Sequence, residues 1–192
     1  VKEKGIVAED GFGEAAFYGP KLDFMAKDSL GRSWQVATIQ LDMNMPERFN
    51  LSCTNEKGED ERIVMIHAAI MGSIERFLSI LIEHYAGAFP LWLSPVQAAV
   101  LSIGEKHREY AENILELLVD NGIRAEIYSD DETLGKKIRN AKTSKIPYFL
   151  VIGDKEVKSK TVTVESRDKG QIGAQKIEEF LSSIQAEIKD KK

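Results

Sequence analysis

A proline-bounded segment, residues 89–95 (FPLWLSP), separates two stretches of the chain that carry different hydrophobic patterns. Before it, runs rich in aromatic and β-branched residues predict strands, and one helix is predicted to follow them after Ser73. After it, predicted strands alternate with predicted helices, which is the pattern of an α/β layer. We therefore predict two domains: an α+β domain with an antiparallel sheet at residues 1–90, and an α/β domain at residues 91–192.

The composition is that of an ordinary globular chain. Its 192 residues are 43% hydrophobic and 30% charged, and the net charge of −5 argues against indiscriminate binding of nucleic acid by the whole surface. Cys53 is the single cysteine, which excludes an internal disulfide, and we expect a cytoplasmic location. The apolar run at 85–104 is interrupted by Pro90 and Pro95, so no membrane association is expected. The first residue is Val1 rather than methionine, and we expect a piece of a longer protein.

The predicted helix after Ser73 combines an apolar stripe with a basic residue in its first turn. With Ser73 as N-cap, apolar residues recur at helical spacing as far as Tyr85 and predict one buried face. Arg76 lies off that stripe, near the positive end of the helix dipole, where a cation gains nothing from the dipole. Arg76 is therefore better explained by a nearby anion such as a polyphosphate, with a solvated surface arginine as the alternative.

Polar side chains interrupt the predicted strands of the first domain, where a plain core would be apolar. They are Tyr18, Lys21, Gln35, Thr38 and Gln40. His67 lies in the last of these strands, and a lone histidine is more often a satisfied core residue than a metal ligand.

The second domain contains a locally basic stretch in an acidic chain. Between Thr133 and Lys160, eight lysines and arginines stand against only Asp154 and Glu156. Such a cluster fits a nucleic-acid backbone, but helix surfaces are also often rich in lysine for solubility. Both interpretations remain open at this point.

Six segments, in order and with compatible spacing, resemble threonyl-tRNA synthetases, which are class II aminoacyl-tRNA ligases. These segments are residues 13–21 (GEAAFYGPK), 34–42 (WQVATIQLD), 46–49 (PERF), 66–67 (IH), 72–76 (GSIER) and 88–97 (AFPLWLSPVQ). The resemblance covers nearly the whole chain. It implies the end of a class II catalytic domain, with an antiparallel sheet and the helix of the third class II motif, followed by an anticodon-binding domain whose mixed sheet is flanked by helices.

The resemblance also implies roles for single residues of the first domain. The assignments are ATP binding by Lys21, Gln35, Thr38 and Arg76, threonine binding by Tyr18 and Gln40, and zinc binding by His67. Strict alternation along a strand places Thr38 and Gln40 on one face and Gln35 on the other. A β-bulge near Val36 and Ala37 is therefore predicted if all three line one site.

For the second domain, the resemblance implies contacts with the tRNA anticodon. Glu156 matches the residue that reads an anticodon base, and Arg139 and Lys145 are expected to contact the anticodon stem-loop. An anion among lysines suits RNA when it accepts hydrogen bonds from a base edge. Four positions depart from the usual pattern, namely Val36, Ala68, Asp131 and Glu165, and the last two put the strength of anticodon recognition in question.

The implied activity is ATP-dependent activation of threonine and its transfer to tRNA-Thr. ATP with Mg²⁺ is the implied cofactor, and Zn²⁺ is implied in the full-length enzyme, a homodimer, with one ligand in this chain. No catalytic base is assigned, because both steps depend on positioning and charge neutralisation. The first two class II motifs and the other zinc ligands are missing, so this chain alone is expected not to aminoacylate. The alternative is a non-catalytic RNA- or anticodon-binding module.

Overall fold

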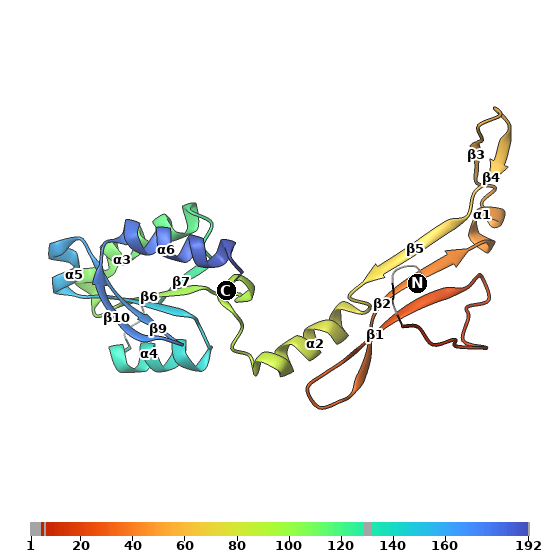
Figure 1. Ribbon diagram of the computed structural model, residues 1–192. Helices are drawn as coiled ribbons and strands as arrows, with labels where there is room; N and C mark the ends of the chain where they lie inside the picture. The colour runs from red at the N-terminus through yellow and green to blue at the C-terminus, as the bar shows by residue number, and fades with distance from the viewer. Residues whose placement is uncertain (1–4, 6, 129–131, 192) are drawn as a thin grey trace. The chain divides into compact units, whose positions relative to one another are not determined.

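The computed structural model describes residues 5, 7–128 and 132–191. The chain divides into two compact units, Val1–His84 and Tyr85–Lys192, and each is described by itself (Figure 1). The predicted boundary lay at residue 90, a few residues later. The difference arises because the segment after the long helix packs with the second unit: the rings of Tyr85 and Phe89 lie 5.9 Å apart, and Arg167 Nη2 donates to the Phe89 carbonyl at 3.0 Å.

The first unit is built on a three-stranded antiparallel sheet with the order β1-β2-β5. Its elements are β1 (Lys21–Lys27), β2 (Ser33–Asp42), α1 (Asn44–Arg48), β3 (Ser52–Thr54), β4 (Asp60–Arg62), β5 (Met65–Ile70) and α2 (Ile74–Tyr85). The antiparallel sheet and the helix that follows it were predicted from the sequence. The short helix α1 and the two-stranded β3-β4 hairpin were not predicted.

The second unit contains a five-stranded mixed sheet with the order β10-β9-β8-β6-β7. Its elements are the 3-10 turns Leu91–Leu93 and Glu105–His107, β6 (Ala98–Ser102), α3 (Arg108–Asp120), β7 (Ala125–Tyr128), α4 (Leu134–Thr143), β8 (Tyr148–Ile152), α5 (Asp154–Ser159), β9 (Val162–Ser166), β10 (Gly170–Gln175) and α6 (Ile177–Lys189). Strands β6, β7 and β8 are parallel, and β9 and β10 add antiparallel pairs. Figure 1 shows α3 and α6 on one face of the sheet and α4 on the other. The predicted mixed sheet flanked by helices is confirmed.

Apolar side chains on both faces of the parallel strands form the core of the second unit. Val100 and Leu150 belong to the larger cluster, with residues of α3 and α6, whereas Leu101 and Phe149 pack with Ala141 of α4. Strands that are buried on both faces read as continuous apolar runs, which is why β6 and β8 could be predicted from the sequence.

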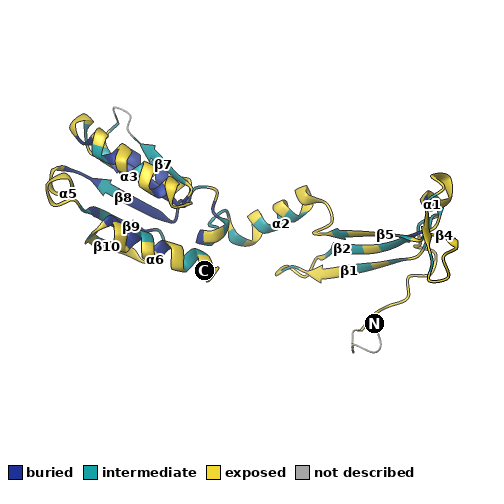
Figure 2. Cartoon of the chain, turned by 90° about the horizontal axis from the view of Figure 1, so that it is seen from above, coloured by how far each residue is buried: buried dark blue, intermediate teal, exposed yellow. Residues whose placement is uncertain are grey.

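The apolar stripe of α2 is not buried, which contradicts the sequence-based prediction. None of the described residues of this helix is buried, and Ile74, Leu78 and Ile82 are 51%, 45% and 51% exposed (Figure 2). Helical spacing fixes which side chains share a face, but burial also needs an apolar surface opposite that face. The described part of the first unit does not provide enough of one.

The start of α4 is capped by the side chain of Thr133. The Thr133 hydroxyl accepts the backbone N–H of Lys136 at 3.4 Å, which satisfies one of the free donors of the first turn.

Candidate functional site

A β-bulge brings the polar residues of β2 onto one face of the antiparallel sheet. The register pairs Lys21 with Gln40 and Asp23 with Thr38, then shifts so that Met25 pairs with Gln35 and Val36 is the extra residue. Opposed residues of an antiparallel pair share a face. The predicted bulge is therefore confirmed, and Gln35, Thr38 and Gln40 face the same side although they do not alternate strictly.

Asp23 organises one end of this polar face. Its carboxylate is paired with the Lys21 ammonium and accepts a hydrogen bond from Gln35 Nε2 at 2.8 Å. The hydrogen bond from Lys21 is the main reason that the pKa of Asp23 lies below its usual value. Thr38 Oγ1 is buried and makes no well-formed hydrogen bond with a described residue, although its hydroxyl is close enough to lower the pKa of Asp23 further. Asp23 was missed in the sequence, yet it alternates with Lys21 along β1.

The other end of the polar face carries Tyr18, Gln40 and His67. The Tyr18 hydroxyl donates to Gln40 Oε1 at 3.2 Å. Gln40 of β2 pairs with His67 of β5 in the antiparallel register. These side chains line a cavity of about 400 Å³, together with Phe17, Asp42, Asn44, Met45 and Arg48. The polar face thus continues into a hollow of small-molecule size.

Asp42, a second missed residue, fixes the position of His67. Its Oδ2 lies 2.8 Å from His67 Nε2, and its Oδ1 accepts the backbone N–H groups of Asn44 and Met45 at 2.9 Å each. The N–H of Met45, followed by His67, holds the pKa of the Asp42 carboxyl below its usual value. Asp42 is 3% exposed, so an ionised carboxylate is buried here with three donors around it.

Arg76 is the one predicted residue of the first domain that this network does not include. It lies in the first turn of α2, exposed, and its guanidinium makes no hydrogen bond or ion pair with a residue in the described ranges. At the start of the same helix, Ser73 Oγ instead donates to Glu75 Oε2 at 2.6 Å. The cation at this helix start is therefore free to meet an anion.

The described residues do not make up a metal site by themselves. Within the parts of the chain that the structure describes, no three His, Cys, Asp or Glu side chains converge to hold a metal ion. His67 fits as one ligand at most, because its Nε2 is engaged by Asp42 and only Nδ1 remains. Among the described helices, none is both long enough and apolar enough to cross a membrane.

In the second unit, Glu156 lies in the first turn of α5 with both carboxylate oxygens engaged. Oε2 accepts the N–H of Gly153 at 2.9 Å, and Oε1 accepts the hydroxyl of Thr163 at 2.8 Å. Burial would raise the pKa of Glu156, but the hydrogen bonds from Thr163 and from the backbone N–H groups of Glu156 and Gly153 outweigh it and lower the pKa. Each oxygen keeps a further lone pair, so the carboxylate is orientated and can still accept from a ligand.

The three residues predicted to contact RNA are not gathered at one point. Glu156 follows the carboxyl end of β8 and Lys145 precedes its amino end, while Arg139 is exposed on α4. Two cations of the basic stretch are also not available to a ligand. Lys136 pairs with Glu132 at 2.6 Å, and Lys137 is only 2% exposed. A ligand that touches all three predicted residues must extend along the full length of β8.

The structure shows the surroundings of three of the four positions that depart from the family pattern. Val36 is the bulged residue of β2. Ala68 pairs with Ile39 on the apolar face of the sheet, opposite to His67. Glu165 forms an ion pair with Lys142 at 2.7 Å. Asp131 lies outside the described residues.

Comparison with known proteins assigns a family to each unit. Residues 3–85 match the tRNA synthetase class II core domain (G, H, P, S and T), and residues 97–187 match the anticodon binding domain. Together they define a segment of class II aminoacyl-tRNA synthetase core joined to an anticodon-binding domain.

Within that class, the chain is recognised as part of a threonyl-tRNA synthetase, as the sequence predicted. It is 50% identical over 192 residues to the threonine–tRNA ligase of Carboxydothermus hydrogenoformans, and 50% identical over 191 residues to that of Acetivibrio thermocellus. It covers 30% of the length of each, and all of this chain is matched.

A solved structure agrees with this recognition. The RNA binding domain of threonyl-tRNA synthetase from Cryptosporidium parvum Iowa II superposes with a TM-score of 0.84 at 38% identity. The match covers 96% of this chain and 47% of that one. Since the chain spans about a third of the curated relatives, the activity of the whole enzyme is a matter for proposal.

Proposed function

We propose that this chain is the portion of a threonine–tRNA ligase that provides one wall of the amino-acid and ATP site and the anticodon-reading domain. The observation that carries the proposal is the polar sheet face, on which a bulge aligns Gln35 with Thr38 and Gln40. Three further polar side chains lie beside them: Lys21, His67 and Tyr18. A sheet face kept for packing alone would not hold polar groups that are bonded to one another beside a hollow.

Within the proposed enzyme, ATP with Mg²⁺ would lie at the Asp23 end of the face. Lys21, Gln35 and Thr38 would contact the nucleotide, and Arg76 would contact its phosphates. Threonine would lie at the other end, with Tyr18 and Gln40 in its pocket. A site that rewards a substrate hydroxyl rejects an apolar isostere far better than an apolar pocket does.

His67 would provide one zinc ligand, in the full-length homodimeric enzyme, with the other ligands coming from residues outside this chain. Zinc would supply a Lewis acid that binds the amino and hydroxyl groups of threonine. Asp42 would hold the His67 ring in place by accepting its Nε2–H, which leaves the lone pair of Nδ1 free to bind the metal. A cytoplasmic location is part of this proposal.

The second unit would bind the anticodon of tRNA-Thr, with Glu156 accepting hydrogen bonds from a base and Arg139 and Lys145 contacting the backbone. The orientated carboxylate of Glu156 supports this role, because its hydrogen bonds to Gly153 and Thr163 fix where the remaining lone pairs point. Exposed cations at Arg139 and Lys145 suit phosphate contacts.

One observation favours a second candidate, a non-catalytic RNA-binding module. Every buried hydrophobic residue among the described ones belongs to the second unit, from Leu91 to Ile184. The anticodon-binding part therefore has a complete core, whereas the synthetase part has none of its own.

Titration of this chain with two ligands separates the candidates. The enzyme portion predicts that Mg²⁺-ATP shifts NMR signals of the Gln35 side chain, and that an anticodon stem-loop of tRNA-Thr shifts signals around Glu156. RNA binding without any response to ATP up to millimolar concentration would favour the RNA-binding module. No response to either ligand would refute both.

A further inference from the structure

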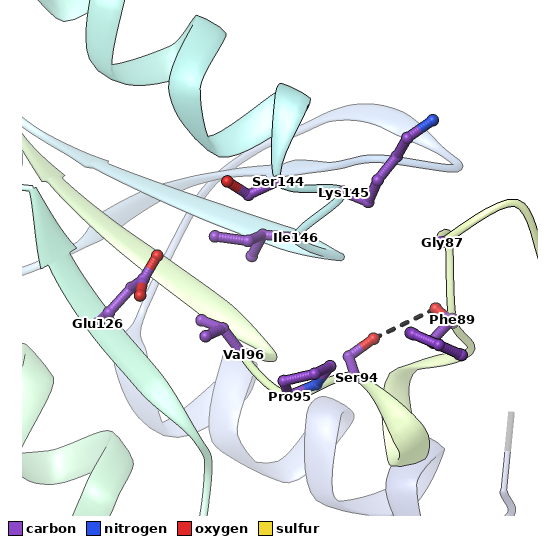
Figure 3. A pocket seen from close by; sticks show the side chains of 9 residues that line it. All are labelled: Gly87, Phe89, Ser94, Pro95, Val96, Glu126, Ser144, Lys145 and Ile146. Atoms are coloured by element: carbon purple, nitrogen blue, oxygen red, sulfur yellow. Dashed lines mark hydrogen bonds between the residues drawn. The ribbon is translucent and has the colours of Figure 1, made fainter. Parts of the chain in front are cut away.

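A cavity of about 200 Å³ opens in the second unit, away from Glu156, at the edge of the sheet where the parallel strands begin. Val96 precedes β6, Ile146 precedes β8, and Glu126 projects from β7. Figure 3 shows their side chains around one hollow, with Phe89 and Pro95 of the segment before β6 closing its lower side. Of the residues assigned to a site above, Lys145 alone lines this cavity.

The walls of the cavity combine apolar surface with one carboxylate. Phe89, Pro95, Val96 and Ile146 contribute apolar surface. Glu126, half-buried on β7, accepts a hydrogen bond from the Tyr128 hydroxyl at 2.7 Å through Oε1. No other described residue donates to this carboxylate, so Oε2 is open to a ligand. Burial, followed by the bond to Glu126, raises the pKa of Tyr128 to about 12, which keeps that hydroxyl a donor.

A cation stands at the rim of the same cavity. Lys145 adopts a left-handed conformation (φ 59) at the end of α4, and its backbone is held by Arg167 Nη1, which donates to its carbonyl at 2.8 Å. Its ammonium makes no ion pair with a residue in the described ranges, and Figure 3 shows the side chain pointing outward from the rim. A left-handed conformation is costly for a residue other than glycine, and here it directs a cation away from the protein.

We propose that this cavity takes a single unpaired base of the bound RNA, with Glu126 accepting from an amino group of the base and Lys145 meeting a backbone phosphate. This inference rests on the proposed RNA-binding function and adds a second base site, at the other end of β8 from Glu156. A hollow that combines apolar walls with an acceptor suits a splayed base.

The carboxylate also selects among bases. Guanine, adenine and cytosine each present an amino group that can donate to Oε2 of Glu126, whereas uracil presents one N–H between two carbonyl oxygens that repel the anion. The site is therefore selective for a base that carries an amino group, and against uracil.

The test is a coupling experiment with an anticodon stem-loop of tRNA-Thr in which each loop nucleotide in turn is replaced by an abasic one. Binding is measured by fluorescence anisotropy for the wild-type chain, Glu126→Gln and a control, Glu116→Gln. The control removes an equal charge from an exposed position on α3, on the opposite face of the sheet. Glutamine retains an acceptor for Tyr128, so Glu126→Gln is expected to fold normally.

We expect an abasic nucleotide at one loop position, different from the position that Glu156 reads, to weaken wild-type binding by about 5- to 150-fold. Glu126→Gln should weaken binding of the intact RNA by about tenfold and have no further effect on that abasic RNA. Ser144→Phe, in which a larger side chain fills the cavity, should give the same pattern. If Glu126→Gln acts equally on every abasic RNA, or matches Glu116→Gln, the base site is refuted while RNA binding stands. If the wild-type chain binds no RNA, the proposed function itself is refuted.

Discussion

Substitution of Glu156 should separate its structural role from its role in recognition. In Glu156→Ala, the N–H of Gly153 and the hydroxyl of Thr163 both lose their acceptor. A hydrogen bond of this kind contributes about 0.5–1.5 kcal/mol, so the free energy of unfolding of the second unit should fall by about 1–3 kcal/mol. For a domain of about 100 residues this corresponds to a drop in Tm of about 4–8 °C per kcal/mol.

Glu156→Gln should change stability much less and recognition just as much. The amide oxygen can accept the Gly153 N–H while the amide nitrogen donates to the Thr163 oxygen, so we expect a loss of stability below about 1 kcal/mol. Because the amide oxygen then accepts from Gly153 and the amide nitrogen is a donor, only one lone pair remains, and two donors of a base edge cannot both be accepted. Discrimination between the cognate anticodon and variants with that base replaced should therefore fall by about 1–3 kcal/mol, or about 5- to 150-fold.

The assay pairs thermal unfolding, followed by circular dichroism, with binding of stem-loops that differ in one anticodon base. The expected order is wild type, Glu156→Gln and then Glu156→Ala for Tm, with equally poor discrimination in both variants. If Glu156→Gln discriminates among anticodons as well as the wild type, Glu156 is only a capping residue and the reasoning is wrong. An equal loss for all anticodons would also count against base reading.

Three further predictions concern charge, core and pH. Lys145→Ala should weaken binding of all anticodon stem-loops alike and lower the salt slope of log K by about 1, and a loss confined to one sequence would contradict this. Phe149→Ala, at a fully buried position, should cost the second unit about 3–5 kcal/mol in urea unfolding; a change below 1 kcal/mol would contradict the packing described. Folding lowers the pKa of Asp42. The ionised carboxylate therefore contributes fully to the stability of the folded state above the ordinary aspartate pKa, and this contribution is lost as pH falls through the lowered value. In Asp42→Asn, the environment of His67, observed by NMR, should no longer change over that acidic range.

The parts of the fold that depend on local pattern could be predicted from the sequence. The position of β8 can be recognised in the sequence, because a run of apolar residues follows Pro147 directly and ends at Gly153. The bulge at Val36 was predicted because three polar side chains could share a face only if alternation failed between Gln35 and Thr38. In both cases neighbouring residues carry the information.

Contacts between distant residues could not be predicted in this way. Asp42 binds His67 although the two are 25 residues apart in the chain, and nothing around Asp42 marks it as the partner of a histidine. The hydrogen bond between Thr163 and Glu156 depends on how α5 packs beside β9. The short elements α1 and α5 were missed for a related reason: a helix of one or two turns has too little periodicity to be distinguished from a turn.

The distribution of buried surface determines which function this chain can perform unaided. In the first unit, the only buried residues among those described are Asp42 and Pro46. The face of its sheet opposite the polar one carries exposed apolar side chains, among them Ile39, Ile66 and Ile70 at 42%, 63% and 81% exposure. An apolar sheet face in water gives up the stabilisation that burial would provide, about 25 cal/mol per Å². We therefore expect the polar face to bind ATP or threonine more weakly in this chain, at millimolar concentrations, than when another surface covers its apolar side, whereas the second unit already has the rigid sheet that an RNA site requires.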